Sequence, residues 1–153
     1  MEPDDREWIA QVITDAFGST RLVSRGRQHD DAHTSDGYVA ELDGRPIGCG
    51  LWREIDGDAE LIALVTTYRG AGAGSAILEE VVAHAREAQW RRLWLITTND
   101  NTDSMRLYQR MGWEWVSFHP DAVTAFRHLK PELPATGYHG IAIRHEIEFA
   151  FPL

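Results

Sequence analysis

The spacing of apolar residues at the start of the chain predicts a helix. Over residues 3–17 apolar side chains recur every three or four positions, and Gly18 follows them. This spacing places the apolar side chains on one helical face, and glycine is common just after a helix C-terminus. Residues 26–37 are polar, and we interpret them as an exposed loop. A metal site in that loop is the less favoured alternative, because tight ligand spacing is missing. The loop contains His29, Asp30, Asp31 and His33.

Three strand-like runs come next. Residues 37–42 and 46–54 flank Asp43-Gly44, and residues 59–66 follow Asp56-Gly57. Asp-Gly between two apolar runs is a strong signal for a tight hairpin turn. The sequence therefore predicts a three-stranded meander ahead of the glycine-rich segment.

After residue 73 helices and strands alternate. Residues 74–88 and 102–111 have helical apolar spacing, while residues 92–98 and 113–118 read as strands. Residues 121–130 look helical up to Pro131, residues 134–140 look like a loop, and residues 141–151 alternate cleanly as a long final strand. We expect that final strand to be exposed, and Phe149 and Phe151 on it would suit a homodimer.

A meander followed by alternating strands and helices predicts one α/β (α+β) domain over residues 1–153. We expect a mixed central sheet with helices on both sides. The length of 153 residues fits one domain that can bury a proper core.

Composition narrows the partners. The net charge of −9 argues against nucleic acid or an anionic membrane as the main partner, and it is compatible with an amine-bearing substrate. The one cysteine, Cys49, is expected to be a small buried strand residue. The N-terminus lacks the apolar run of a signal peptide, and no apolar stretch approaches the roughly 20 residues of a membrane span. We therefore expect a cytoplasmic protein.

The glycine-rich segment over residues 66–75 carries the clearest chemical signal. It lies between a strand and a helix, where free backbone N–H groups and a positive helix end favour a phosphate or diphosphate. A P-loop is disfavoured because Gly74 stands where its lysine should be. A dinucleotide fingerprint is disfavoured because the preceding strands are joined as hairpins. A tight turn with no ligand remains an alternative.

Two motifs in this part of the chain resemble the GNAT family of N-acetyltransferases. The first is Arg or Gln, two residues, Gly, one residue, then Gly or Ala. The second, about 30 residues later, begins at an asparagine and ends in Gly-aromatic. The residues that match are Arg69, Gly72 and Gly74, then Asn101, Ser104, Tyr108 and Gly112-Trp113. The resemblance covers residues 39–118 well, whereas about 22 residues, 119–140, separate the last two strands where the family often has a short loop.

The resemblance implies a mixed, mostly antiparallel sheet of six to seven strands and acetyl-CoA as co-substrate. It implies that a backbone N–H of Leu64 polarises the thioester carbonyl and that Thr66 pairs with the pantetheine. Backbone amides of residues 69–75 would bind the diphosphate. The full set of implied cofactor-binding residues is Leu64, Thr66, Arg69, Gly70, Ala71, Gly72, Ala73, Gly74, Ser75, Asn101 and Ser104.

The family match also implies roles in proton transfer. Tyr108 matches the tyrosine that protonates the leaving thiolate, and Glu60 stands where many members carry a glutamate base. A solvent-facing strand glutamate and a core tyrosine are the ordinary alternatives. Other candidates for the base are Glu54, Asp100 and His119. We expect no metal and no covalent acyl-enzyme intermediate.

The acceptor is the least determined part. By fold analogy the first helix, the loop after it and residues 119–140 lie near its entrance. The side chains that could line it are Trp52, Glu54, His119, Tyr138 and His139. A non-catalytic module that binds or senses acyl-CoA is the alternative from a different class, and a nucleotide-binding protein is a weaker third.

Overall fold

A computed structural model describes residues 5–153. Helix α1 spans Asp5–Phe17, so Pro3 of the expected first helix lies outside the described residues. The strands are β1 Leu22–Ser24, β2 Arg27–His29, β3 Asp36–Leu42, β4 Arg45–Ile55, β5 Asp58–Thr66, β6 Arg92–Thr98, β7 Glu114–His119 and β8 Glu146–Phe151. The remaining helices are η1 Ala32–Thr34, α2 Ala73–Glu87, α3 Thr102–Arg110, α4 Ala122–Phe126, η2 Arg127–Leu129 and η3 Tyr138–Gly140.

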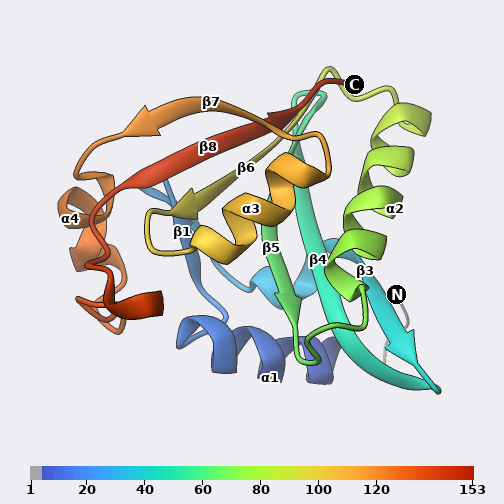
Figure 1. Ribbon diagram of the computed structural model, residues 1–153, viewed down its shortest axis with the longest axis horizontal. Coiled ribbons are helices and arrows are strands. Elements are labelled where there is room, and N and C mark those ends of the chain that lie inside the picture. Colours follow the sequence, from blue (N-terminus) through green and yellow to red (C-terminus); the bar gives the residue numbers. More distant parts are fainter. Residues whose placement is uncertain (1–4) are drawn as a thin grey trace.

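Six strands form one twisted sheet in the order β3-β4-β5-β6-β8-β7, and β1 pairs with β2 in a separate hairpin (Figure 1). Every pair in the large sheet is antiparallel except β5 with β6. The predicted mixed, mostly antiparallel sheet flanked by helices is therefore confirmed. Among residues 5–153, no helix is long and apolar enough to cross a membrane.

Both predicted Asp-Gly turns are present. Asp43 and Gly44 have φ values of 51° and 71°, and Asp56 and Gly57 have values of 51° and 84°. Two consecutive positive φ angles match the right-handed twist of the flanking strands, and Asp-Gly adopts them readily. These turns fix the β3-β4-β5 meander in the register that the alternating pattern requires.

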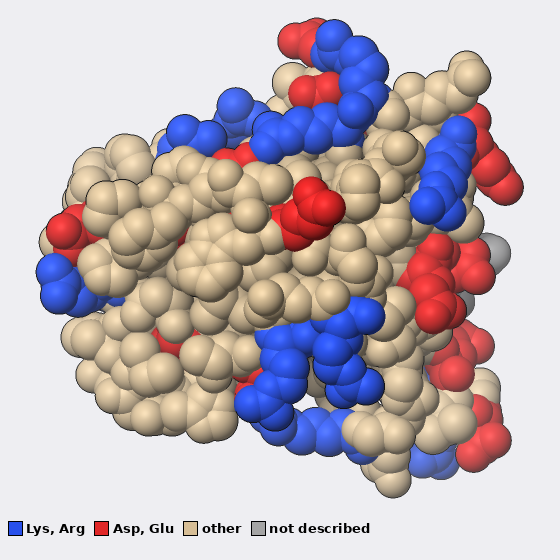
Figure 2. Space-filling view, turned by 45° about the horizontal axis from the view of Figure 1, so that its top comes forward, with Lys and Arg blue, Asp and Glu red and all other residues tan. Residues whose placement is uncertain are grey.

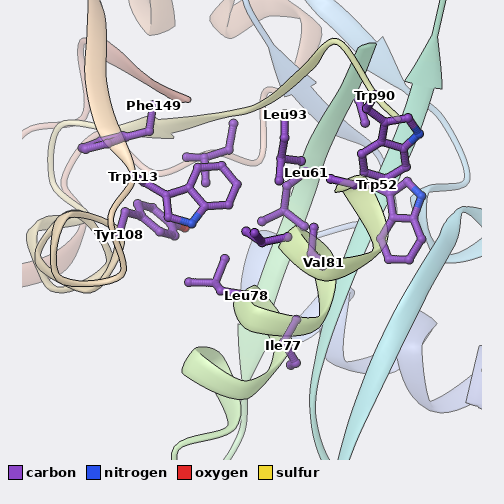
Figure 3. Close-up of a cluster of buried hydrophobic side chains, with 14 of the residues drawn as sticks. Trp52, Leu61, Ile77, Leu78, Val81, Trp90, Leu93, Tyr108, Trp113 and Phe149 are labelled. Atoms are coloured by element: carbon purple, nitrogen blue, oxygen red, sulfur yellow. The ribbon is translucent and has the colours of Figure 1, made fainter. Parts of the chain in front are cut away.

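Helices α2 and α3 cover one face of the sheet with an apolar core. Ile77, Leu78 and Val81 of α2 pack against Leu61 and Leu93 of the sheet (Figure 3). At one end of this core Trp52 meets Trp90, with ring centroids 5.9 Å apart. At the other end three aromatic side chains gather, from α3, the turn after it and β8. They are Tyr108, Trp113 and Phe149.

Helix α1 covers part of the opposite face. Ile9, Val12 and Ile13 of α1 pack against the other side of β4 and β5, where Cys49 and Ala63 are buried. Cys49 is fully buried in β4, as predicted, and burial raises the pKa of its thiol to about 12. The thiol is therefore a packing group.

The prediction for residues 26–37 is wrong. Instead of an exposed loop, this region completes the β1–β2 hairpin, which turns at Arg25 and Gly26 with φ values of 48° and 70°. His29, expected to be exposed, is only 2% exposed. The hairpin escaped prediction because it covers a polar patch of the sheet, so its strands lack apolar alternation.

The prediction for the end of the chain is partly wrong. The final strand begins at Glu146, five residues later than expected, because residues 141–145 are held by side chains of the preceding turns. Strand β8 is not exposed, since β6 and β7 pair with its two edges and Phe149 is fully buried. The proposed dimer through β8 therefore loses its basis. The helix expected over 121–130 is α4 followed by the short η2.

Residues 120–145 form a compact excursion between the paired ends of β7 and β8. His119 and Glu146 are register partners, so the excursion leaves and re-enters the sheet at one place. Arg127 donates hydrogen bonds to the carbonyl oxygens of Leu133 and Ile143, which closes the excursion on itself. Lys130 Nζ donates to the Arg21 carbonyl at 2.8 Å and so joins it to the β1 side of the molecule.

Candidate active site

The site is organised around the point where β5 and β6 separate. The two strands pair only over residues 58–60 and 92–94, and Glu60 opposite Trp94 is the last pair. Beyond it β5 runs on to Thr66 while β6 turns away beside β8 (Figure 1). Glu60 therefore lies at the vertex of a splayed pair of strands.

A β-bulge modifies β5 just beyond that vertex. Trp52 pairs with Leu61 but Leu51 pairs with Ala63, so Ile62 is an extra residue with no partner on β4. Bulges re-aim the backbone and side chains that follow them. Leu64 comes next, half-buried and opposite Gly50, and Thr66 ends the strand in an exposed position.

The glycine-rich segment forms the turn from β5 into α2. Gly70 and Gly72 have φ values of 83° and 75°, which is why glycine suits both positions. Gly72 precedes α2 without a side-chain cap, and the first turn of the helix has no acidic residue. The first hydrogen bond of the helix joins Ala76 N–H to the Gly72 carbonyl, so the N–H groups of residues 73–75 start free of helical partners. This geometry suits an anion.

Close packing brings α2 and α3 together at this turn. A Cβ added at Gly74 would lie 3.2 Å from Leu107 Cδ2, so glycine allows the approach of the two helices. Asn101 precedes α3, and its Nδ2 donates to Thr97 Oγ1 at 3.0 Å. The two predicted motifs are therefore neighbours in space through Gly74 and α3.

Tyr108 of α3 is buried against Phe149, at 5.5 Å between ring centroids. Burial raises the pKa of its phenol to about 12, against a smaller opposing effect of a hydrogen bond with Ser104. The phenol is thus a protonated donor at neutral pH. The structure gives Tyr108 a core contact with Phe149, and its role as an acid stays a prediction.

Glu60 is buried in a polar network on the opposite face. Its Oε1 accepts a hydrogen bond from Ser24 Oγ at 2.5 Å, and Ser24 Oγ is 3.0 Å from His29 Nε2. Its Oε2 has no hydrogen-bond partner among residues 5–153, although His29 Nε2 is 3.5 Å away. Burial raises the pKa of Glu60, while the Ser24 hydrogen bond and Arg27 oppose the rise.

Two further carboxylates of β8 share this face. Both oxygens of Glu146 accept the backbone N–H of Arg25, at 3.1 and 3.0 Å. Glu148 contacts Arg25 at 3.4 Å, His119 at 3.3 Å and, closest of all, the guanidinium of Arg92. These contacts fix the tip of the β1–β2 hairpin against the sheet beside Glu60.

The other candidate bases are less suited to proton transfer. Glu54 is exposed on β4, next to the 56–57 turn and opposite Ala59 of β5. This end of β5 is remote from the glycine-rich turn. Asp100 is buried with both oxygens engaged, by Thr98 Oγ1 at 2.5 Å and by the Tyr138 N–H at 3.0 Å. His119 is bound to Glu148. Of these side chains, Glu60 alone combines burial with an unengaged oxygen.

Comparison with known proteins gives the family. The model of the acetyltransferase (GNAT) family matches residues 7–113. The chain belongs to the GNAT acetyltransferase family. Two relatives from Bacillus subtilis (strain 168) match most of the chain. YdhI is 41% identical over 117 residues, which cover 75% of this chain and 72% of YdhI. YxbD is 32% identical over 144 residues, which cover 93% of this chain and 89% of YxbD.

Solved GNAT structures share the fold. A GNAT family acetyltransferase from Elizabethkingia anophelis, crystallised with acetyl-CoA bound, covers 81% of this chain and 80% of its own. The TM-score is 0.68 and the identity is 23%. At that identity the likeness shows the fold, and it confirms the architecture that the two GNAT motifs implied.

The GNAT motifs did not indicate the polar network around Glu60. Ser24, His29, Glu146 and Glu148 come from segments on either side of the matched motifs. Only Gly26, at the hairpin turn, was a local signal for this region. The acceptor-lining candidates are dispersed: Trp52 is buried between Tyr38 and His84, whereas Tyr138 is exposed and His139 binds Asp103 at 3.1 Å.

Surface charge differs between the two helices of this GNAT fold. Figure 2 shows Asp and Glu along the side on which α2 lies and Lys and Arg around a hollow on the same view. Exposed Glu79, Glu80 and Glu87 belong to α2. Exposed Arg106 and Arg110 belong to α3, where they line a depression of about 440 Å³. Although the net charge of the chain is negative, α3, the helix that packs against Gly74, carries exposed basic side chains.

Proposed function

We propose that this GNAT protein moves an acetyl group from acetyl-CoA directly to an amine. The observation that carries the proposal is the position of an uncapped glycine-rich helix start at the end of the strand that leaves β6 at Glu60. Free N–H groups of residues 73–75 and positive-φ Gly70 and Gly72 fit a diphosphate. The Elizabethkingia neighbour, which contains acetyl-CoA, supports the same ligand for this fold.

The protein's own groups then have defined tasks. Acetyl-CoA supplies a thioester whose carbonyl carbon is the electrophile. The Leu64 N–H, beyond the bulge, polarises the carbonyl oxygen, and such donors are worth a few kcal/mol of barrier. Thr66 pairs with the pantetheine arm, and residues 69–75, together with Asn101 and Ser104 beside them, hold the nucleotide end.

Two side chains handle the protons. An ammonium with a pKa near 10 is mostly charged at neutral pH, so a base must take its proton before the nitrogen can attack. Glu60 does so through Oε2, directly or across one water. Tyr108, protonated at neutral pH because its pKa is raised to about 12, gives a proton to the departing thiolate.

The first experiment is a thermal-shift series. Acetyl-CoA is expected to raise the melting temperature, while ATP and NAD leave it unchanged, because a ligand that binds only the folded state stabilises it. Release of free CoA in the presence of a panel of amines then separates an acetyltransferase from a non-catalytic acyl-CoA-binding module. No affinity for any CoA species would overturn the proposal.

A further inference from the structure

The β1–β2 hairpin places two polar side chains directly on Glu60. Ser24, which pairs with Arg27 at the tip, and His29, which pairs with Leu22 at the base, lie diagonally across the hairpin, and both are within 3.5 Å of the carboxylate. Leu22, opposite His29, is buried in the α1 core and anchors the base of the hairpin. The tip is held by Glu146 and Glu148. The hairpin is thus fixed at both ends, with its polar side chains turned to Glu60.

The hydrogen-bond directions in this network are determined by its chemistry. A carboxylate only accepts, so Ser24 donates its one hydroxyl hydrogen to Glu60 Oε1. Ser24 Oγ must then accept from His29, which places a proton on Nε2. Burial, aided by Arg53 and Arg27, lowers the pKa of His29 to about 4, so the ring is neutral at pH 7. The order of donors is His29, Ser24, Glu60.

One carboxylate oxygen is left over in this cluster. Both oxygens of Glu146 accept from Arg25, and both oxygens of Glu148 face Arg92, Arg25 or His119. Oε1 of Glu60 is held by Ser24. Oε2 of Glu60, buried and without a hydrogen bond in the described part of the chain, has capacity for a proton.

We propose that Ser24 and His29 are positioning residues that fix Glu60 through Oε1, so that Oε2 takes the proton of the acceptor amine. This inference rests on the proposed function. The ammonium gives its proton to Oε2, the nitrogen lone pair forms the new C–N bond, and the C–S bond breaks. The thiolate receives the Tyr108 proton, the acylated nitrogen gives up its second proton to solvent, and exchange with solvent returns both side chains to their starting states.

The groups that face Glu60 determine how the network affects its titration. On the hairpin these are Ser24, His29 and Arg27, and on β8 they are Glu146 and Glu148. Burial, and to a smaller extent the two carboxylates, raise the pKa of Glu60, whereas Ser24 and Arg27 lower it. Loss of the Ser24 hydroxyl therefore raises it further. Because a hydrogen bond to a carboxylate favours its charged form, its loss should move the titration of Glu60 up by about one pH unit or more.

The experiment uses the full chain with five substitutions, the fifth being His29→Asn. Ser24→Ala removes the donor and Ser24→Thr keeps it. Ser19→Ala is the matched control, because Ser19 donates to Glu132 at 2.7 Å in an exposed pair outside this network. Glu60→Gln assigns the Glu60 carboxyl resonance. Two quantities are measured: the NMR titration of the Glu60 carboxyl, and the pH dependence of kcat/KM with an amine that the panel has identified.

In Ser24→Ala we expect both the Glu60 titration and the acidic limb of kcat/KM to move up by about one pH unit. The high-pH plateau stays within a few-fold of wild type. Ser24→Thr restores the wild-type profile, and Ser19→Ala leaves it in place. His29→Asn, which removes the Nε2 donor but keeps the Ser24 hydroxyl, moves both quantities in the same direction by less.

Coincident titrations in wild type and Ser24→Ala would overturn the inference. A shifted Glu60 titration with an unshifted pH profile of kcat/KM would also overturn it. A lower high-pH plateau of kcat/KM without a shift of the acidic limb would do the same, because it would mark a purely structural role of the hairpin. The NMR titration needs no turnover. Failure of the proposed function, seen as no CoA release with any amine, is therefore distinct from failure of Ser24 to control Glu60.

Discussion

The two faces of the central sheet differ in what they bury, and the difference begins between adjacent residues of β8. Phe149 enters an apolar core beneath α2 and α3, while Glu148 enters the polar network beneath the β1–β2 hairpin. Both side chains are buried. On one face the burial of apolar side chains stabilises the fold. On the other face charged side chains are buried, which is costly unless they are paired. The apolar core and the buried polar network are thus separated by the thickness of one sheet.

The largest effect should come from breaking the apolar face. Phe149→Ala removes a fully buried ring that contacts Tyr108 and Trp115, and we expect a loss of about 3–5 kcal/mol in the free energy of unfolding. Urea titration followed by tryptophan fluorescence measures it. Phe118→Ala, on the exposed side of β7, is the matched control and should cost less than about 1 kcal/mol. Equal losses in the two variants would contradict a core centred on Phe149.

Breaking the polar face should affect catalysis more than stability. Glu60→Gln keeps the shape of the side chain but removes the proposed base, and kcat/KM should fall about 100-fold or more, while acetyl-CoA affinity measured by calorimetry stays near wild type. Glu54→Gln changes an exposed glutamate on the neighbouring strand and tests the alternative base. A large loss in that variant and none in Glu60→Gln would reassign the base.

Acid should weaken the polar face specifically through His29. Its pKa is near 6.5 in the unfolded chain and is lowered to about 4 in the fold, so the unfolded chain binds the extra proton as pH falls. Stability from this group is therefore present above pH 6.5 and declines toward pH 4. Glu60, whose pKa is raised, acts in the opposite direction, which makes a comparison with a variant necessary.

We expect the stability difference between wild type and His29→Gln to shrink by about 2 kcal/mol between pH 7 and pH 5. Urea titrations at each pH measure it. His128→Gln, at an exposed position, is the control and should show a difference that does not depend on pH. A constant difference for His29→Gln would mean that His29 is not held neutral in the fold.

The smallest effect concerns Tyr108, which belongs to the apolar face and which we propose as the acid. Tyr108→Phe should lower kcat about ten-fold or more, as expected for loss of a general acid, with acetyl-CoA affinity little changed. Its ring packing is preserved, so the free energy of unfolding should change by about 1 kcal/mol at most. Wild-type turnover in this variant would leave Tyr108 as a core residue only.

The sequence predicted the apolar face better than the polar one, for a physical reason. Strands β3 to β5 and helices α2 and α3 each bury one side, so their apolar spacing reveals both type and limits. The β1–β2 hairpin buries Ser24 and His29 against Glu60, and no alternation marks such strands. The beginning of β8 was predicted too early because Ile141 and Ile143, which precede the paired strand, already follow its alternating pattern.

The same contrast holds for the site. The glycine-rich turn and Tyr108 each lie in a contiguous motif, so both can be predicted from the sequence alone. The Ser24, His29 and Arg25 contacts depend on pairings 31 to 123 positions apart, which only the folded chain brings together. Glu60 was predicted as a base from its distance to the motif, and its unengaged oxygen is visible only in the folded structure.

The register partnership of His119 and Glu146 has a consequence for the length of the chain that joins β7 to β8. The 26 residues between them begin and end at one rung of the sheet. The pairing of β7 with β8 therefore does not depend on the length of the chain that joins them. Each doubling of such a connection costs only about 0.6 kcal/mol of closure entropy. A segment of a different length can therefore be joined at this rung without a change in the pairing of β7 with β8.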